Sequence, residues 1–249
     1  MSAYQYQDFK ILEVQGVDTK KFLQGLTTAD LNILSPTSNI LLTAFANLKG
    51  RVISLSFIKY ISDDKFLLSV EEGILEILLS WLKKYGMFSK VSFSINDQYA
   101  LFFTDNGFLK HDILHIGGLE FDISFEEVQK QNILNKLAII DKKNTEKFLP
   151  AELELDNLEN VVSYKKGCYM GQEVIARIHY KAKLKKELVV VKTSFDVQEQ
   201  DLKDQYSKPL ANVVNKVFLD NQCYMLVVFH KEATESEYQL EDGHKIIKC

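Results

Sequence analysis

Apolar and polar residues alternate with the two-residue period of β-strands along several stretches of the chain. These stretches are bounded by residues that favour turns, such as Asn-Leu-Lys-Gly at 47–50. We therefore predict strands at residues 9–14, 41–46, 52–60, 66–70, 90–95, 99–103, 112–116 and 119–123. The turns at 96–97 and 117–118 predict that their flanking strands pair as hairpins.

Other stretches repeat their apolar residues with the period of a helix. The clearest runs over residues 71–84 and stops at Gly86. Its apolar face consists of Ile74, Ile77, Leu78, Trp81 and Leu82. Shorter helices are predicted at 18–26, 125–137 and 172–180, and the second of these opens on acidic residues, which favour a helix N-terminus.

The chain beyond residue 185 is dominated by strand-like runs. They lie at residues 188–191, 211–218, 224–229 and 245–248, with polar segments between them. We expect a separate small β domain there. Because strands and helices occur in groups rather than in strict alternation, the predicted fold class is α+β with antiparallel sheets.

The composition is that of an ordinary globular protein, with 249 residues of which 46% are hydrophobic and 26% charged. The formal net charge of −4 excludes a protein whose whole surface binds nucleic acid. The sequence contains no apolar run of the length that a membrane helix needs, about 18 to 20 residues. Its first residues lack the features of a signal peptide. We expect a cytoplasmic protein without a membrane segment.

Cysteines and histidines give no pattern typical of a metal site. The three cysteines are far apart, which fits neither a disulfide framework nor a C-x-x-C site, and indicates a reducing compartment. His111 and His115 have the spacing of two ligands on a helix, but the neighbouring residues predict a strand. We therefore predict no metal ligands.

The most unusual segment begins at Lys165 and reads KKGCYMGQEVIAR. Its two glycines, Gly167 and Gly171, allow backbone conformations closed to other residues and a close approach to a ligand. A helix start just after Cys168, with Lys166 and Arg177 nearby, would favour the thiolate form of the cysteine. The alternative is a glycine-rich turn whose cysteine packs as a small hydrophobic residue.

This segment resembles the signature K-G-C-Y-x-G-Q-E of the YgfZ (CAF17-type) folate-binding proteins, which are relatives of the glycine-cleavage T-protein. Four further blocks of the chain are similar to the family in the same order, at residues 14–30, 47–51, 82–91 and 148–150. The resemblance implies a three-lobed fold around a central opening of the size of a folate. It implies a discontinuous first domain (1–46 plus 110–180), an inserted α/β domain (47–109) and a C-terminal β-barrel-like domain (181–249).

The resemblance also implies a function: a monomeric, tetrahydrofolate-binding accessory protein that supports iron-sulfur client proteins and, through iron-sulfur enzymes that thiolate tRNA, tRNA modification. Cys168 would be the functional thiol, with Lys166 and Arg177 lowering its pKa or holding the anionic ligand. The residues expected to contact the folate are Phe9, Lys166, Gly167, Tyr169, Gly171, Gln172, Glu173 and Arg177.

The glutamate tail of a folate is anionic, so a basic rim would attract it. Basic residues are dense around the signature, at Lys165, Lys166, Arg177, Lys181, Lys183, Lys185 and Lys186. The alternative is a solvated charged face. The same stretch lacks the interleaved aromatic residues of a nucleic-acid stacking platform.

The chain departs from its relatives in two segments where those relatives carry acids. Ser54 and Leu55 stand where aminomethyltransferases have an acidic pair that includes the catalytic aspartate, and without it aminomethyl transfer loses a charge-stabilising group. Leu134 stands where relatives carry the glutamate that holds the pterin ring. We therefore predict a binding protein, with a folate-dependent one-carbon transferase as the alternative. A scaffold that has lost its ligand is the third reading.

Overall fold

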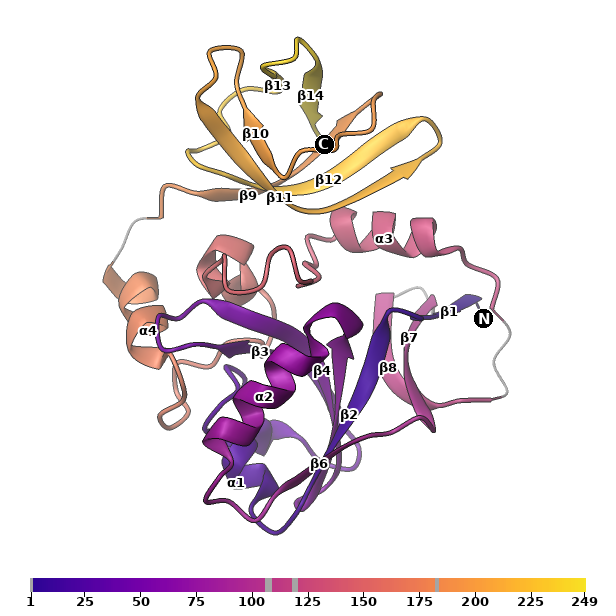
Figure 1. Cartoon of the computed structure of the whole chain (residues 1–249), viewed down its shortest axis with the longest axis vertical. Coiled ribbons are helices and arrows are strands. Elements are labelled where there is room, and N and C mark those ends of the chain that lie inside the picture. The colour runs from indigo at the N-terminus through magenta and orange to yellow at the C-terminus, as the bar shows by residue number, and fades with distance from the viewer. Residues whose placement is uncertain (1, 106–108, 118–120, 182–183) are drawn as a thin grey trace.

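The computed structural model describes residues 2–105, 109–117, 121–181 and 184–249, and its described strands form three antiparallel sheets (Figure 1). Helices accompany these sheets without the regular alternation of a βαβ fold. The predicted α+β class with antiparallel sheets is therefore confirmed.

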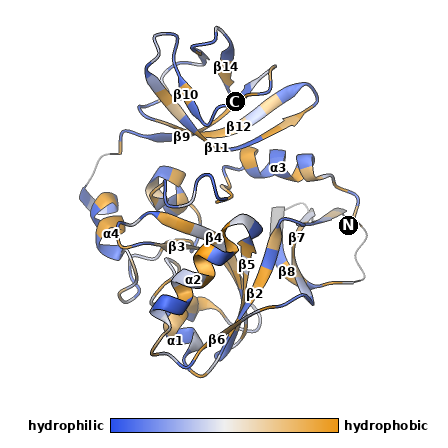
Figure 2. Cartoon of the chain, in the orientation of Figure 1, coloured by the Kyte–Doolittle hydropathy of each residue, from blue (hydrophilic) through white to orange (hydrophobic). Residues whose placement is uncertain are grey.

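The largest core lies on a five-stranded sheet with the strand order β3-β4-β5-β2-β6. The strands are β2 (Phe9–Gln15), β3 (Ile40–Ala46), β4 (Val52–Ser62), β5 (Lys65–Glu71) and β6 (Ser92–Ile95). Helix α2 (Leu75–Tyr85) contributes Leu78 and Leu82 to the core, whereas Ile77, predicted to face inward, is exposed. Figure 2 shows hydrophobic residues along the strands and an alternation of hydrophobic and hydrophilic residues on α2. This is the pattern of an amphipathic helix on a sheet.

A three-stranded sheet has the order β1-β7-β8 and consists of β1 (Ser2–Gln5), β7 (Tyr99–Asp105) and β8 (Leu109–His115). The predicted hairpin across the turn at 96–97 is wrong, because β6 pairs with β2 whereas β7 pairs with β1 and β8. The first strand of the second predicted hairpin is present as β8, and it pairs with β7. Residues 118–120 of its return strand lie outside the described residues, and residues 121–123 are not a strand.

Helix α3 (Phe125–Leu134) begins at a capping box formed by Ser124 and Glu127. The helix ends at Leu134, three residues before the predicted end at 137. Lys136, two residues beyond the helix, adopts a left-handed conformation with a φ of 55°. The helix packs against the C-terminal sheet, as Figure 1 shows.

The C-terminal sheet contains six strands in the order β10-β11-β12-β9-β14-β13 and curls around its own core (Figure 1). The strands are β9 (Glu187–Thr193), β10 (Asp201–Lys203), β11 (Pro209–Leu219), β12 (Gln222–Phe229), β13 (Glu237–Gln239) and β14 (Lys245–Lys248). The predicted C-terminal β-barrel-like part is confirmed. The boundary predicted at 46/47 falls between β3 and β4, which pair with each other. The proposed division into three domains stays a prediction.

Short helices complete the chain. They are α1 (Thr19–Gln24), η1 (Leu31–Ile33), η2 (Glu72–Ile74), η3 (Pro150–Leu153), η4 (Leu155–Asn157) and α4 (Gln172–Lys181). Throughout the described part of the chain, the helices are too short or too polar to cross a membrane.

Candidate functional site

The signature segment is fixed to the rest of the protein by a buried lysine. Lys166 is only 8% exposed, and its Nζ donates to the carbonyl oxygens of Thr27 and Ala29, each at 2.7 Å. The same Nζ lies 5.0 Å from the ring centre of Tyr169. Burial lowers the pKa of Lys166 to about 8, although the nearby Asp30 carboxylate opposes the shift. Its ammonium therefore anchors the 27–29 turn, and its donors are engaged within the protein.

Cys168 stands exposed next to this anchor. Gly167 before it is also exposed, and a Cβ atom at that position would meet no described atom within 4 Å. The cysteine thus does not pack as a small hydrophobic residue, which was the alternative interpretation of the motif. An exposed thiol on an anchored loop is open to a partner or a reagent.

The second glycine of the signature serves a close backbone contact. Gly171 has a φ of 78°, and a Cβ atom there would lie 2.5 Å from the carbonyl oxygen of Asn47. Gly50 has a φ of 72° and approaches Val174 and Ile175 in the same way. Two sequence motifs far apart in the chain therefore meet through their glycines, and Gly171 approaches protein backbone.

The remaining signature residues divide between core and surface. Tyr169 is buried with Ala46 and Ile175, and burial raises its pKa to about 12. Its hydroxyl has no hydrogen-bond partner among the described residues. The other side of α4 borders an open hollow of about 510 Å³. Its lining residues are Gln172, Glu173, Ala176, Arg177, Tyr180 and Lys181.

Phe9 lies in a different place from the signature. It lines a small, dry pocket of about 20 Å³ together with Leu55, Phe57 and Ile139. Its ring packs edge-on against Tyr6 at 5.2 Å between centres. The structure therefore separates the predicted folate contacts into two regions, and the pocket beside Phe9 is too small for a pterin ring.

A buried polar network fills the space beside Phe9. Nδ2 of Asn132 donates to the hydroxyl of Tyr6 at 2.8 Å, and this hydroxyl also forms a hydrogen bond with Nε2 of His111 at 2.9 Å. His111 also stacks on Phe57, with 4.6 Å between ring centres. Burial lowers the pKa of His111 to about 4, which keeps the imidazole neutral.

Ser54, Leu55 and Leu134, the three residues singled out from the sequence in place of acids, have different surroundings. Ser54 is buried and its hydroxyl lies 3.1 Å from that of Ser56, while Leu55 faces the dry pocket. Leu134 is 42% exposed and does not line that pocket, whereas Asn132 does. The residue that faces the pocket from α3 is thus two positions earlier than the one singled out from the sequence.

The basic residues around the signature do not form one surface. Lys165 and Lys185 are exposed, but Lys186 pairs with the buried Glu152 at 2.9 Å. Arg51 reaches the same carboxylate at 3.0 Å. Lys183 lies outside the described residues. At least Lys186 of this basic cluster is therefore engaged in a structural ion pair.

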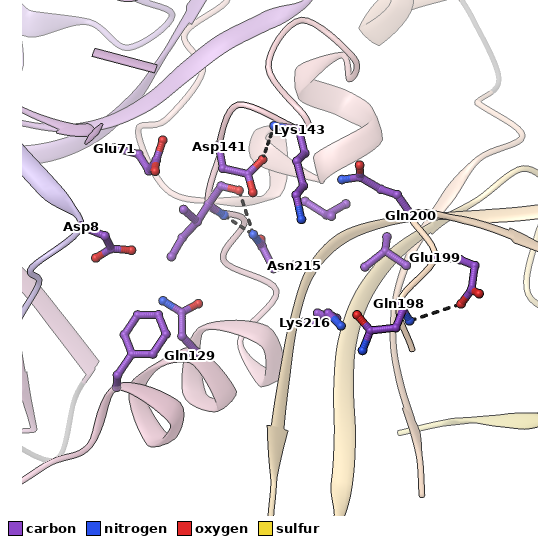
Figure 3. Close-up of a pocket in the computed structure, with 14 residues that line it drawn as sticks. Asp8, Glu71, Gln129, Asp141, Lys143, Gln198, Glu199, Gln200, Asn215 and Lys216 are labelled. Atoms are coloured by element: carbon purple, nitrogen blue, oxygen red, sulfur yellow. Dashed lines mark hydrogen bonds between the residues drawn. The ribbon is translucent and has the colours of Figure 1, made fainter. Parts of the chain in front are cut away.

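Another cavity, of about 430 Å³, was missed by the sequence analysis (Figure 3). It lies between the end of the five-stranded sheet, α3, the 139–143 loop and the C-terminal sheet. Its polar side chains include Asp8, Glu71, Gln129 and Asp141. These residues are scattered through the sequence, and only the pairing of Phe9 with Glu71 in the sheet hints that Asp8 and Glu71 are neighbours.

A β-bulge shapes one wall of this cavity. The pairing of β11 with β12 shifts between Val213 and Asn215. The bulge lets consecutive residues from Val213 to Lys216 line one cavity, which a regular strand with alternating sides would not allow. Ile139 lines both this cavity and the dry pocket, so it forms the partition between them.

The sequence is similar to those of known bacterial proteins. No family model matches the chain. An uncharacterized protein of Haemophilus influenzae is 29% identical and is aligned over 100% of this chain and 95% of its own. The tRNA-modifying protein YgfZ of Buchnera aphidicola is 29% identical over 70% of this chain and 68% of its own.

Among solved structures, the glycine cleavage system aminomethyltransferase T from Bartonella henselae superposes with a TM-score of 0.74. The superposition covers 98% of this chain and 83% of that chain at 14% identity, which supports the fold alone. The predicted resemblance to YgfZ-type proteins with a T-protein-like fold is therefore confirmed.

Proposed function

We propose that this chain is a cytoplasmic, YgfZ-type accessory protein that acts in tRNA modification, binds tetrahydrofolate and supports iron-sulfur enzymes. The observation that carries the proposal is the exposed thiol of Cys168 on a loop held by the buried Lys166 and by Gly171. An exposed cysteine has little packing value, so a rigid support beneath it favours a chemical role. The relatives named tRNA-modifying protein YgfZ supply the context.

The surroundings of Ser54 and Leu55 favour binding over aminomethyl transfer. Both side chains lie within the protein and neither carries a charge. A developing cationic or proton-transferring centre would find no carboxylate there, and electrostatic stabilisation of this kind is usually a large part of catalysis. We therefore place the one-carbon transferase behind the accessory protein as a candidate function.

The test is restoration of tRNA thiolation in a bacterial host that lacks its own YgfZ-type protein. Thiolated nucleosides in total tRNA are measured by mass spectrometry after expression of the wild type, Cys168→Ala or Cys249→Ala. We expect the wild type and Cys249→Ala to restore the nucleosides and Cys168→Ala to fail. Cys249 is the matched control because its thiol is also exposed. Restoration by Cys168→Ala at the wild-type level would contradict the role of the thiol.

A further inference from the structure

The outer face of α4 is hollowed over a volume of about 510 Å³. Figure 1 shows this helix at the left edge of the molecule. Residues four apart lie on one side of a helix, so the residues that line the hollow form two neighbouring rows. Ala176 stands in the middle of its row, and its small side chain leaves space between the larger ones. We call this region the α4 surface, and its rows are Gln172, Ala176, Tyr180 and Glu173, Arg177, Lys181.

Tyr180 presents an exposed aromatic ring that neighbouring rings hold in place. The residue is 67% exposed. Its ring stands at 84° to that of His179 and at 67° to that of Tyr164, with 4.8 Å and 5.7 Å between the ring centres. Those two rings stack on each other at 3.9 Å, and Nδ1 of His179 lies 3.2 Å from the carboxylate of Asp156. An aromatic ring that is braced but accessible offers its face to a flat ligand.

The cations of the α4 surface are available to an anion. Arg177 and Lys181 are exposed, and within the described part of the chain neither forms an ion pair. Lys165, which follows Tyr164 in the chain, is exposed as well. These three positive charges exceed the single negative charge of Glu173, although the whole protein has a net charge of −4. A local excess of positive charge on an acidic protein attracts an anionic partner.

The shape of the hollow selects between two kinds of anionic partner that contain flat rings. The resemblance predicted that Gln172, Glu173 and Arg177 contact a folate. A small-molecule site encloses most of its ligand, whereas this hollow is open and is lined by residues of α4 alone. A single-stranded nucleic acid needs no enclosure, because its bases stack on exposed rings and its phosphates bind exposed cations. The α4 surface offers both kinds of group side by side.

We propose that the α4 surface binds the unpaired bases of an RNA loop such as those of a tRNA. One base would stack on Tyr180, and the phosphates beside it would contact Arg177 and Lys181. Gln172 and Glu173 lie about two turns earlier in the helix. They would contact the neighbouring nucleotide through the edge of its base or its ribose hydroxyl.

The inference rests on the proposed function and extends it. Because α4 begins four residues after Cys168, an RNA bound here would lie close to the exposed thiol. The proposed role in tRNA modification would then include direct contact with the RNA, in addition to the support of client enzymes.

The test is fluorescence anisotropy of the full chain with a labelled RNA hairpin that has the stem and loop of a tRNA anticodon arm. The same stem as a blunt duplex, without unpaired bases, should bind more weakly by about fivefold or more. Tyr180→Ala should weaken hairpin binding by a similar factor, whereas Tyr180→Phe should retain it because a phenyl ring still stacks. Arg177→Gln and Lys181→Gln should each weaken binding and reduce the slope of log K against log salt by about 0.7.

The matched controls are Tyr206→Ala and Lys208→Gln, which should bind the hairpin like the wild type. Tyr206 is 72% exposed and Lys208 is exposed, and both lie between β10 and β11 of the C-terminal sheet. Thermal unfolding of each variant verifies folding. The replaced side chains of Tyr180, Arg177 and Lys181 are exposed, so the midpoints should stay close to that of the wild type.

The outcomes separate this inference from the proposed function. Hairpin binding that is unchanged in Tyr180→Ala and Arg177→Gln, or equal binding of the blunt duplex, would overturn the inference. A wild type that restores tRNA thiolation in the host but binds no hairpin would overturn the inference and leave the proposed function standing. A wild type that binds the hairpin through Tyr180 but restores no thiolation would support the α4 surface and contradict the proposed function.

Discussion

The backbone of Gly171 lies against the carbonyl oxygen of Asn47, closer than any other residue type at this position would permit. A methyl group at its Cα would reach to 2.5 Å from that oxygen, and its φ of 78° is a left-handed conformation. This contact joins the start of α4 to the turn between β3 and β4. The position of the signature segment therefore depends on the absence of a side chain.

Gly171→Ala should destabilise the protein. The left-handed conformation costs a side chain about 1–2 kcal/mol, and the contact with Asn47 adds to this. We expect the free energy of unfolding, measured in urea, to fall by about 2–4 kcal/mol. Gly167→Ala is the control and should change it by less than about 0.5 kcal/mol, because its Cβ would enter open space. Equal stability of the two variants would contradict the contact.

Lys166→Met should change how stability depends on pH. The pKa of Lys166 is about 8 in the folded protein against an ordinary value of 10.5. Between these values the unfolded chain holds a proton that the folded protein has released, so the contribution of this lysine to stability rises with pH. We expect the free energy of unfolding of the wild type, relative to Lys166→Met, to increase from pH 7.5 to pH 9.5.

The control for that measurement is Lys165→Met, because Lys165 is an exposed neighbour. This variant should follow the pH dependence of the wild type. Lys166→Met should also be less stable at pH 7.5 by about 1–3 kcal/mol, since the carbonyls of Thr27 and Ala29 lose their donor. A pH dependence of Lys166→Met identical to that of the wild type would show that the lysine does not titrate in this range.

Thiol labelling should distinguish Cys168 from Cys223. In a Cys249→Ser background, a thiol reagent should modify one cysteine of the folded protein and two after unfolding. Cys223 is fully buried, and burial raises the pKa of its thiol, which reduces its reactivity. Peptide mapping should assign the rapid modification to Cys168. Labelling of both thiols at the same rate would place Cys223 at the surface.

His111 should remain neutral in mildly acidic solution. Its pKa of about 4 lies below the ordinary 6.5, so the unfolded chain takes up the proton first and stability is lost as the pH falls from 6.5 towards 4. We expect nitrogen NMR to find a neutral imidazole in the folded protein, with no change down to pH 5. Titration of this imidazole near pH 6.5 in the folded protein would contradict the buried network with Tyr6.

The sequence predicted the local elements better than their partners. The periodicity around Leu78 and Leu82 identifies α2, because a helix with one buried face has apolar residues at intervals of three or four positions. The turn at Asn96 has the composition of a hairpin, but here it carries the chain from one sheet to another. The residues of a turn therefore do not determine with which strands its two flanking strands pair.

The candidate site was predicted in part. The motif around Cys168 could be recognised as a string, and the exposure of the thiol agrees with a chemical role. The burial of Lys166 could not be foreseen, because lysine is rarely buried and its carbonyl partners lie about 140 residues away in the chain. The cavity acids were invisible for the same reason: Asp8 and Glu71 are ordinary residues until the sheet brings them together.

The partition formed by Ile139 gives the protein a simple route to a new specificity. On one side of this side chain is a space lined by several carboxylates, and on the other a small pocket lined largely by aromatic and aliphatic residues. Replacing isoleucine by a smaller residue would enlarge both spaces, since Ile139 lines each of them. One codon therefore sets the volume on both sides of this side chain.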